Sequence, residues 1–413
     1  MRLTPRTALA LSLLALGCGA VSALGCSGAS SGSGDSGGAP GSGGSGGTGI
    51  TFGGSGGGSG SGGKLTEAPP CEPKDPNADL DKDGFTPAQG DCNDCTAQMN
   101  PGAFDYRSNG VDEDCNGTPD DEPTDCDATH VDVASSDAEL AARVIGVCRK
   151  ATGKSWGLVS ARYVKADGTV GMADASHGLL PAFGPNVKPR HGANLLALSS
   201  GTARQPSDPG FQSPDGAQMS TSSWTPPGFP IDSPSCAGVK TADDNKAMNP
   251  AALELVIRAP TNANQLSFDF SFYTYEFPSF VCTKFNDFFV ALQSPAPPSA
   301  QSGNISFDSQ GNPVSVNNGF LEVCDPAVGA KKPGGKLFPC ALGTGQLQGT
   351  GFEPGAATGW LVTRSPVAGG YEVTLRFAIW DMGDEVLDST VLIDNLSFDF
   401  GEGGTPVTQP VPR

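Results

Sequence analysis

Apolar and polar side chains alternate along much of the second half of the chain, and this pattern predicts β-strands. The clearest run is LSFDFSFYTYEF, in which every second residue from Leu266 to Phe272 is apolar. A period of two places those side chains on one face of a strand, against a core. Similar patterns predict further strands at 156–163, 253–258, 286–293, 304–308, 313–317, 358–364, 371–380 and 389–400.

The last of these strands changes phase part-way along. Its apolar side chains occupy odd positions at Val391 and Ile393, and even positions from Leu396 onward. A shift of one residue would turn the apolar side chains to the opposite face of a regular strand. We therefore expect a bulge or a bend at Asp394 and Asn395.

About nine short strands separated by Gly- and Pro-rich turns predict a mainly β fold, a β-sandwich of jelly-roll type. One helix is expected in front of the strands. Ser136, Asp137 and Glu139 form a capping box, and apolar residues follow at intervals of four as far as Cys148. This predicts a helix from about Asp137 to Lys150. The sandwich domain then spans 125–400, and 401–413 is predicted to be a frayed, disordered tail.

The N-terminal residues have the pattern of an export signal. Arg2 and Arg6 precede an apolar run, and Cys18 and Cys26 each follow Ala-Leu-Gly, which resembles a bacterial lipoprotein cleavage box. Lipidation of Cys26 leaves ten other cysteines, an even number, whereas lipidation of Cys18 leaves eleven. We therefore favour a signal peptide at 1–26 with a lipid on Cys26. Lipidation of Cys18 and ordinary secretion after Ala23 are the alternatives.

These signals predict an exported protein held in the cell envelope, at the outer membrane or the cell surface, by its N-terminal lipid. No later apolar run reaches the roughly 18 residues that a membrane-spanning helix needs. Residues 27–66 are mostly Gly and Ser, so they are predicted to be a disordered linker.

Composition argues against nucleic acid as a partner and against catalysis. The chain has 25 Lys and Arg against 44 Asp and Glu, a net charge of −19, whereas phosphate binding needs clustered basic residues. Its three histidines lie in no metal-ligand spacing, and an even cysteine count leaves no free thiolate. A Ser-His-Asp arrangement cannot be read from the sequence because its members lie far apart. We therefore predict that the protein is not an enzyme.

Residues 67–124 form an acidic cassette that contains two similar loops. Asp79, Asp81 and Asp83 precede Gly84, and Asp112, Asp114 and Asn116 precede Gly117. Oxygens at alternate positions, a glycine turn and then an inward carbonyl are what a Ca²⁺ loop presents. The glutamate at position 12 of an EF-hand is absent, but Asp91 and Asp120 or Asp121 could replace it. The predicted metal ligands are Asp79, Asp81, Asp83, Phe85, Asp91, Asp94, Asp112, Asp114, Asn116 and Asp120.

The cassette has too few apolar residues to build a core, so metal ions and disulfides must supply its order. Cys92 and Cys115 occupy equivalent places beside the two loops, which leaves Cys71 to pair with Cys95. In the sandwich, residues close in sequence are expected to pair. The predicted disulfides are Cys92–Cys115, Cys71–Cys95, Cys126–Cys148, Cys324–Cys340 and Cys236–Cys282.

Two stretches resemble known families. The pattern DxDxDGF…GDCND…NPGA…NGxDxDCNG resembles the MopE-type metal-binding motif of secreted and surface proteins of myxobacteria, and also the type-3 repeats of thrombospondin. Copper, which the name of that family suggests, prefers His, Met or Cys ligands, so the oxygens here favour Ca²⁺ instead. The chain is thus similar to a myxobacterial surface lipoprotein.

The second resemblance is to the choice-of-anchor L domain. FYTYEFPSFVCTKFNDFFVAL, NISFDSQGNPVSVNN, GTGF, TGWL and FAIWDMGDEVLDSTVLIDNLSF carry it. It implies an extracellular β domain and no particular activity or ligand. Seven polar residues of these stretches could gather at the sandwich edge as a second Ca²⁺ site, or else cap their own turns. They are Glu276, Asn286, Asp287, Asp381, Asp384, Asp388 and Asp394.

We therefore predict a non-catalytic, lipid-anchored surface protein. It would bind Ca²⁺ structurally and present a β-sandwich for adhesion to a surface polysaccharide or to another surface protein. The alternatives are a carbohydrate-active extracellular hydrolase on the same scaffold and a purely structural coat component.

Overall fold

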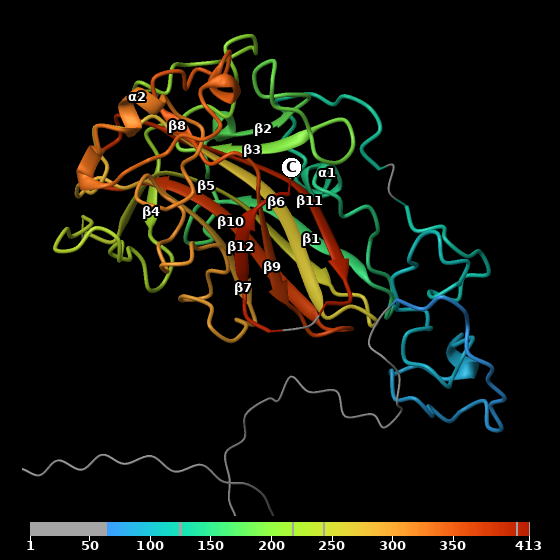
Figure 1. Ribbon diagram of the computed structural model, residues 1–413. Helices are drawn as coiled ribbons and strands as arrows, with labels where there is room; N and C mark the ends of the chain where they lie inside the picture. The colour runs from blue at the N-terminus through green and yellow to red at the C-terminus, as the bar shows by residue number, and fades with distance from the viewer. Residues whose placement is uncertain (1–63, 124–125, 217–218, 243, 402–403, 413) are drawn as a thin grey trace, which may run out of the picture. The chain divides into compact units, whose positions relative to one another are not determined.

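The computed structural model describes residues 64–123, 126–216, 219–242, 244–401 and 404–412 (Figure 1). The predicted signal peptide, Cys18, Cys26 and nearly all of the predicted linker lie outside the described residues. Within those residues, no helix has both the length and the apolar character needed to cross a membrane.

Two antiparallel sheets form a sandwich, as the alternating pattern predicts (Figure 1). The first sheet has the order β1-β5-β10-β7, with β4 paired to β5. Its strands are β1 (Gly157–Val164), β4 (Ser222–Trp224), β5 (Lys246–Arg258), β7 (Phe288–Ser294) and β10 (Glu372–Asp381).

The second sheet has the order β12-β9-β6-β11-β3-β2, with β8 paired to β6. Its strands are β2 (His177–Leu180), β3 (Leu195–Ser199), β6 (Gln265–Thr274), β8 (Ala356–Ala357), β9 (Leu361–Pro366), β11 (Ser389–Asp399) and β12 (Val407–Pro410).

The main core lies between the sheets and is built from the residues that the sequence pattern singles out. Leu266, Phe268, Phe270 and Phe272 of β6 are fully buried, and aromatic rings pack across the interface. The rings of Phe268 and Phe377 lie 4.9 Å apart, and those of Phe270 and Phe289 lie 5.0 Å apart. Ring pairs at such distances stabilise a core beyond the area that they bury.

The phase change in β11 corresponds to an irregularity. The pairing of β11 with β6 shifts register between Asp394 and Ser397, and Asn395 has a φ of 54°. The bulge lets Ile393 and Phe398, at positions of opposite parity, both join the core.

The predicted helix is shorter than expected. α1 spans Ala138–Val144, and the side chain of Asp137 accepts hydrogen bonds from the backbone of Glu139 and Leu140, as the capping box predicts. The helix ends because Gly146 takes a φ of 113° and the chain turns onto β11, where Leu396 donates its backbone N–H to Ile145. A tertiary contact thus stops the helix before its predicted end at Lys150. The other helical turns are η1 (Pro87–Gln89), η2 (Asp174–Ser176), α2 (Pro326–Gly329), η3 (Pro333–Gly335) and η4 (Gly345–Leu347).

Two of the predicted strands do not form, and several strands of the structure were not predicted. The stretches 304–308 and 313–317 form only isolated bridges, such as Phe289 with Val314. Strands β2, β3, β4, β8 and β12 lack the alternation that would have revealed them. β12 lies in the predicted disordered tail and pairs with β9, so that prediction fails for Val407–Pro410.

Candidate metal centre

The first acidic loop folds around its own carboxylates. Asp79 accepts hydrogen bonds from the backbone N–H groups of Lys82 (2.6 Å) and Gly84 (3.1 Å). Asp81 Oδ1 accepts from the N–H of Asp83, and Asp83 Oδ1 from that of Phe85. Gly84 has a φ of 94°, a conformation that side chains disfavour, which accounts for the glycine at position 6.

Each carboxylate beyond Asp79 keeps one oxygen that has no hydrogen-bond partner. These atoms are the Oδ2 atoms of Asp81, Asp83, Asp91 and Asp94, and all four are buried. The side chains of Asp91 and Asp94 are 5% and 0% exposed. A buried oxygen without a partner costs free energy, so this arrangement favours a proton, a water molecule or a cation beside these oxygens.

The carboxylates of this region converge. Asp79, Asp81 and Asp83 each place one oxygen within 4.8 Å of the others, and Asp81, Asp91 and Asp94 form a second such group. Asp81 belongs to both groups, so the two groups adjoin and together involve five carboxylates. Asp91 and Asp94 are held in place because Asp91 Oδ1 accepts from the N–H of Asn93 and Asp94 Oδ1 from that of Leu80.

Burial and mutual repulsion raise the pKa values of Asp81, Asp83 and Asp91. Burial is the main cause for Asp83, whose pKa rises to about 7, and for Asp81, whose pKa rises to about 6. Neighbouring carboxylates add to both shifts, and the pKa of Asp91 is raised for the same reasons. A divalent cation among the five groups would remove this penalty, because opposite charge favours the ionised form.

The donor set fits a hard cation such as Ca²⁺, which takes six to eight oxygen ligands. Asp79, Asp81, Asp83, Asp91 and Asp94 would hold it, and their negative charge would attract it. The sequence also predicts the backbone carbonyl of Phe85 as a ligand. In the structure the Phe85 side chain is buried, and the ammonium group of Lys154 lies 5.0 Å from its ring.

The second loop repeats part of the hydrogen bonding of the first. Asp112 accepts from the N–H groups of Asn116 (3.1 Å) and Gly117 (2.9 Å). The bond from the glycine matches that of Asp79, whose other bond comes instead from Lys82, one position earlier in its loop. Asp114 Oδ1 accepts from the N–H of Asn116, and Asn116 Oδ1 accepts from that of Thr118. Asp120, the other predicted ligand, instead accepts from the N–H groups of Asn109 and Gly110.

The second loop differs in what its remaining atoms contact. Asp114 Oδ2 accepts a 2.7 Å hydrogen bond from the guanidinium of Arg149, and the Asn116 amide donates to Asp121. Among the described residues, Asp112 and Asp114 join no group of three carboxylates within 4.8 Å. The two loops therefore share a backbone fold but differ in how charge is neutralised.

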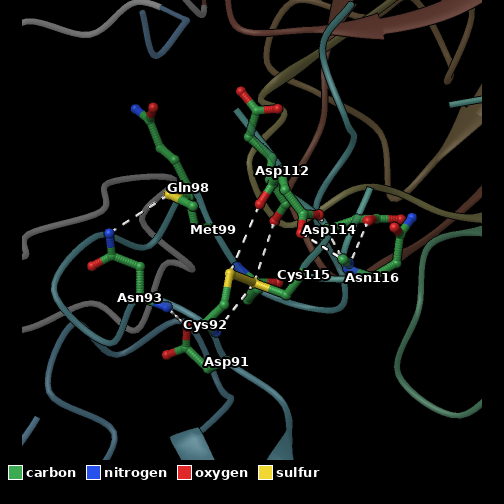
Figure 2. Close-up of a disulfide and its surroundings, with 12 residues drawn as sticks. Asp91, Cys92, Asn93, Gln98, Met99, Asp112, Asp114, Cys115 and Asn116 are labelled. Carbon is green, nitrogen blue, oxygen red and sulfur yellow. Dashed lines mark hydrogen bonds between the residues drawn. A yellow bond between two sulfur atoms is a disulfide. The ribbon is translucent and has the colours of Figure 1, made fainter. Parts of the chain in front are cut away.

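A disulfide links the two loops. Figure 2 shows the Cys92–Cys115 bond, with Asp91 on one side and Asp112, Asp114 and Asn116 on the other. All five pairs that the sequence suggests are bonded in the structure. They are Cys71–Cys95, Cys92–Cys115, Cys126–Cys148, Cys236–Cys282 and Cys324–Cys340.

The seven polar residues predicted for a second site do not form one group. Glu276, Asp287 and Asp381 are buried at one end of the sandwich, where Asp287 donates its N–H to Glu276, and their pKa values are raised mainly by burial. Electrostatic repulsion from Asp388 raises the pKa of Asp381 further. Repulsion from the partly exposed Asp384 does the same for Glu276 and Asp287. The amide of the buried Asn286 has no hydrogen-bond partner.

Asp394 has different contacts. It lies at the bulge of β11 and accepts from the backbone N–H groups of Arg190 (2.6 Å) and His191 (3.2 Å). Burial raises its pKa to about 7. No group of three carboxylates within 4.8 Å forms at the sandwich end among the described residues. The second Ca²⁺ site stays a prediction.

The histidines His130 and His177 have different surroundings. His130 is exposed, and His177 is buried with its ring 4.0 Å from that of Tyr163. Burial lowers the pKa of His177 to about 4, so the ring is neutral at pH 7. A hollow of about 690 Å³ lies elsewhere, but its Asp308 and Lys336 are occupied by hydrogen bonds to neighbouring residues of the same domain.

Arg149 and Lys154 belong to this centre but were not recognised from the sequence. Arg149 contacts Asp114 across 35 residues, and Lys154 donates to the carbonyl of Gly84 at 2.7 Å across 70 residues. Their position beside Cys148 in sequence gives no sign of these contacts. Only the folded chain brings them to the loops.

Comparison with known families agrees with both resemblances. Residues 91–121 match the MopE-type metal-binding motif, and residues 195–399 match the choice-of-anchor L domain. No curated protein and no solved structure gave a significant match. The chain thus carries a MopE-type motif followed by a choice-of-anchor L domain. Neither family is enzymatic, and both indicate an extracellular or cell-surface protein.

Proposed function

We propose that this chain, a MopE-type motif joined to a choice-of-anchor L domain, is a surface protein whose cassette is held rigid by Ca²⁺. The cation binds at the first loop and acts as a structural element. The sandwich serves adhesion or recognition of a surface polymer, and the N-terminal lipid holds the protein to the cell envelope.

One observation carries the metal assignment. The Oδ2 atoms of Asp81, Asp83, Asp91 and Asp94 are buried without partners, within a set of carboxylates whose oxygens converge. Lys154 donates to the carbonyl of Gly84, and no described Lys or Arg forms an ion pair with these carboxylates. A divalent ion satisfies all of these oxygens at once, whereas a proton can satisfy only one or two.

The contacts between the cassette and the sandwich support a structural role. Thr261 donates its N–H to the carbonyl of Gly102, and its hydroxyl to Asn100. Asn262 accepts from the N–H of Phe104 and donates to its carbonyl. The Phe104 ring lies 5.3 Å from that of Trp156. Cassette and sandwich are thus joined by ordered polar and aromatic contacts, and an ordered cassette would keep them in place.

Two exposed aromatic residues bear on the adhesion role. Trp224 and Tyr371 are 69% and 72% exposed, as residues of a recognition surface would be. However, Trp224 pairs with the first residue of β5, whereas Tyr371 bonds to Ala259, just beyond its last residue. The two aromatic residues thus lie at opposite ends of a 13-residue strand and form no common patch.

Calorimetric titration of the EDTA-treated full chain with Ca²⁺ tests the metal assignment. We expect D81N and D94N to abolish binding, because each removes charge from the converging oxygens. D75N is the matched control, since Asp75 caps the exposed N–H of Asn77 and belongs to neither carboxylate group. Absence of Ca²⁺ binding by the unmodified chain would refute the proposal.

Binding to arrays of surface polysaccharides, with and without Ca²⁺, tests the recognition role. Retention that is lost in EDTA would support recognition by a sandwich that depends on an ordered cassette. If the protein binds no polysaccharide on the arrays, the alternative of a purely structural coat component is favoured.

A further inference from the structure

We infer that the cassette takes up one divalent cation and not two, because the guanidinium of Arg149 occupies the place of a cation in the second loop. This inference rests on the proposed Ca²⁺ site in the first loop. It concerns which of two nearly identical loops exchanges ions with the solvent.

The two loops share several of their backbone hydrogen bonds. The first aspartate of each accepts from the N–H of position 6, as Asp79 does from Gly84 and Asp112 from Gly117. The second aspartate accepts through Oδ1 from position 5 in both loops. The loops therefore present the same oxygen, the Oδ2 of the second aspartate, for charge neutralisation.

That oxygen meets opposite surroundings in the two loops. In the first loop, Asp81 Oδ2 is buried without a partner and lies close to Asp91 and Asp94. In the second loop, the equivalent Asp114 Oδ2 pairs with Arg149 Nη1 at 2.7 Å. Position 5 also differs, because the neutral Asn116 replaces Asp83 and both polar atoms of its side chain already have partners.

The structure holds Arg149 firmly at this place. Its backbone carbonyl accepts from the N–H of Leu158 at 2.7 Å, and the neighbouring Cys148 is bonded to Cys126. The same Nη1 atom lies 3.4 Å from Glu122 Oε2, which also accepts from the indole N–H of Trp156. One guanidinium thus serves two carboxylates whose side chains are only 2% exposed.

A fixed guanidinium and an exchangeable ion have different consequences. Arg149 is covalently part of the chain, so chelators cannot remove it. A hollow of about 510 Å³ lined by Asp114, Asn116, Arg149 and Lys154 gives solvent access to the pair. A cation could therefore reach Asp114 once the guanidinium is gone.

Counting the bound ions tests the inference. Equilibrium dialysis of the full chain against Ca²⁺ should give one ion per chain, and still one in D114N, but none in D81N. Two ions in the unmodified chain would overturn the inference while leaving the proposed function intact. No bound ion would refute the proposed function itself.

Arg149 variants provide the sharper test. R149Q should bind two ions, whereas R149K, which keeps a positive charge at the loop, should bind one. A single ion in R149Q would show that the loop rejects cations for another reason, and would overturn the role given to Arg149. Near-UV circular dichroism checks that the variants fold, and if R149Q fails to fold, the counts for the unmodified chain and D114N decide.

Discussion

The cassette and the sandwich achieve order by different means. Within 67–123, five apolar side chains are buried, Phe85, Met99, Ala103, Tyr106 and Val111, against six buried acids, Asp91, Asp94, Asp105, Glu113, Asp114 and Glu122. The sandwich instead buries a continuous core from both of its sheets. A small module that buries this much charge can be stable only if each charge is neutralised locally.

Comparison of the two regions suggests three ways of neutralising a buried carboxylate. The first loop would use an exchangeable cation, and the second uses the guanidinium of Arg149. At the end of the sandwich, no described Lys or Arg forms an ion pair with Glu276, Asp287 or Asp381. Protons are the simplest remaining solution there. Chelators, mutations and pH should therefore affect different parts of one chain.

Truncation of the aromatic core should give the largest effect. F377A removes a fully buried ring that packs on Phe268 from the opposite sheet. We expect the free energy of unfolding of the sandwich to fall by about 3–5 kcal/mol, as for other buried aromatic residues. Guanidinium denaturation followed by tryptophan fluorescence measures it. A loss below about 1 kcal/mol would show that the sheets do not depend on this contact.

Removal of the disulfide between the two loops should have the next largest effect, and only in the cassette. The Cys92–Cys115 bond closes a loop with a sequence separation of 23. Chain entropy predicts a loss of about 3 kcal/mol for the double variant C92A/C115A. Hydrogen exchange should show faster exchange in 67–123 and unchanged exchange in β6 and β10. Equal acceleration in both regions would contradict the separation of their stabilities.

The buried acids of the sandwich should give a pH-dependent effect. Burial raises the pKa of Asp287 to about 7, so the folded protein binds its proton more tightly than the unfolded chain does. Stability should therefore be greatest below about pH 4 and fall as the pH rises towards 7. D287N removes this cost and should stabilise the sandwich at pH 8 by about 2 kcal/mol, with little change at pH 4.

The same variant separates a proton from a cation at this site. If Asp287 instead helps to bind Ca²⁺, as the sequence suggested, D287N should destabilise the sandwich in Ca²⁺. The stability difference between D287N and the unmodified protein should then be the same at both pH values. Thermal unfolding of both proteins at pH 4 and pH 8, in Ca²⁺ and in EDTA, distinguishes the two. The matched control is D308N, since Asp308 is also buried but its carboxylate accepts hydrogen bonds from Asn312 and Gly319.

Local patterns were sufficient where a contact is made by neighbouring residues. The alternation along β6 predicted its buried face, and the spacing of Asp79, Asp81 and Asp83 predicted oxygens that converge. They failed where a residue distant in sequence makes the contact. The helix ends early because Leu396 hydrogen-bonds to Ile145 at its carboxyl end. In the second loop, Arg149 from outside the cassette binds Asp114. Two loops of nearly the same sequence can therefore have different chemistry.

The smallest effect tests the one element that local sequence predicted almost entirely. Asp137 accepts from the N–H groups of Glu139 and Leu140 at the start of α1, whereas the end of the helix is set by β11. D137A should therefore cost about 1 kcal/mol, the usual loss for an N-terminal cap. D137N, which keeps the accepting oxygen, should cost only a few tenths of that. Since α1 packs on β1 and β3, the loss should appear in the unfolding of the sandwich and leave Ca²⁺ binding unchanged. A change in Ca²⁺ affinity would contradict this prediction. It would mean that α1 couples the two regions through Arg149, which follows it in the chain. The stabilities of the cassette and the sandwich would then not be separate.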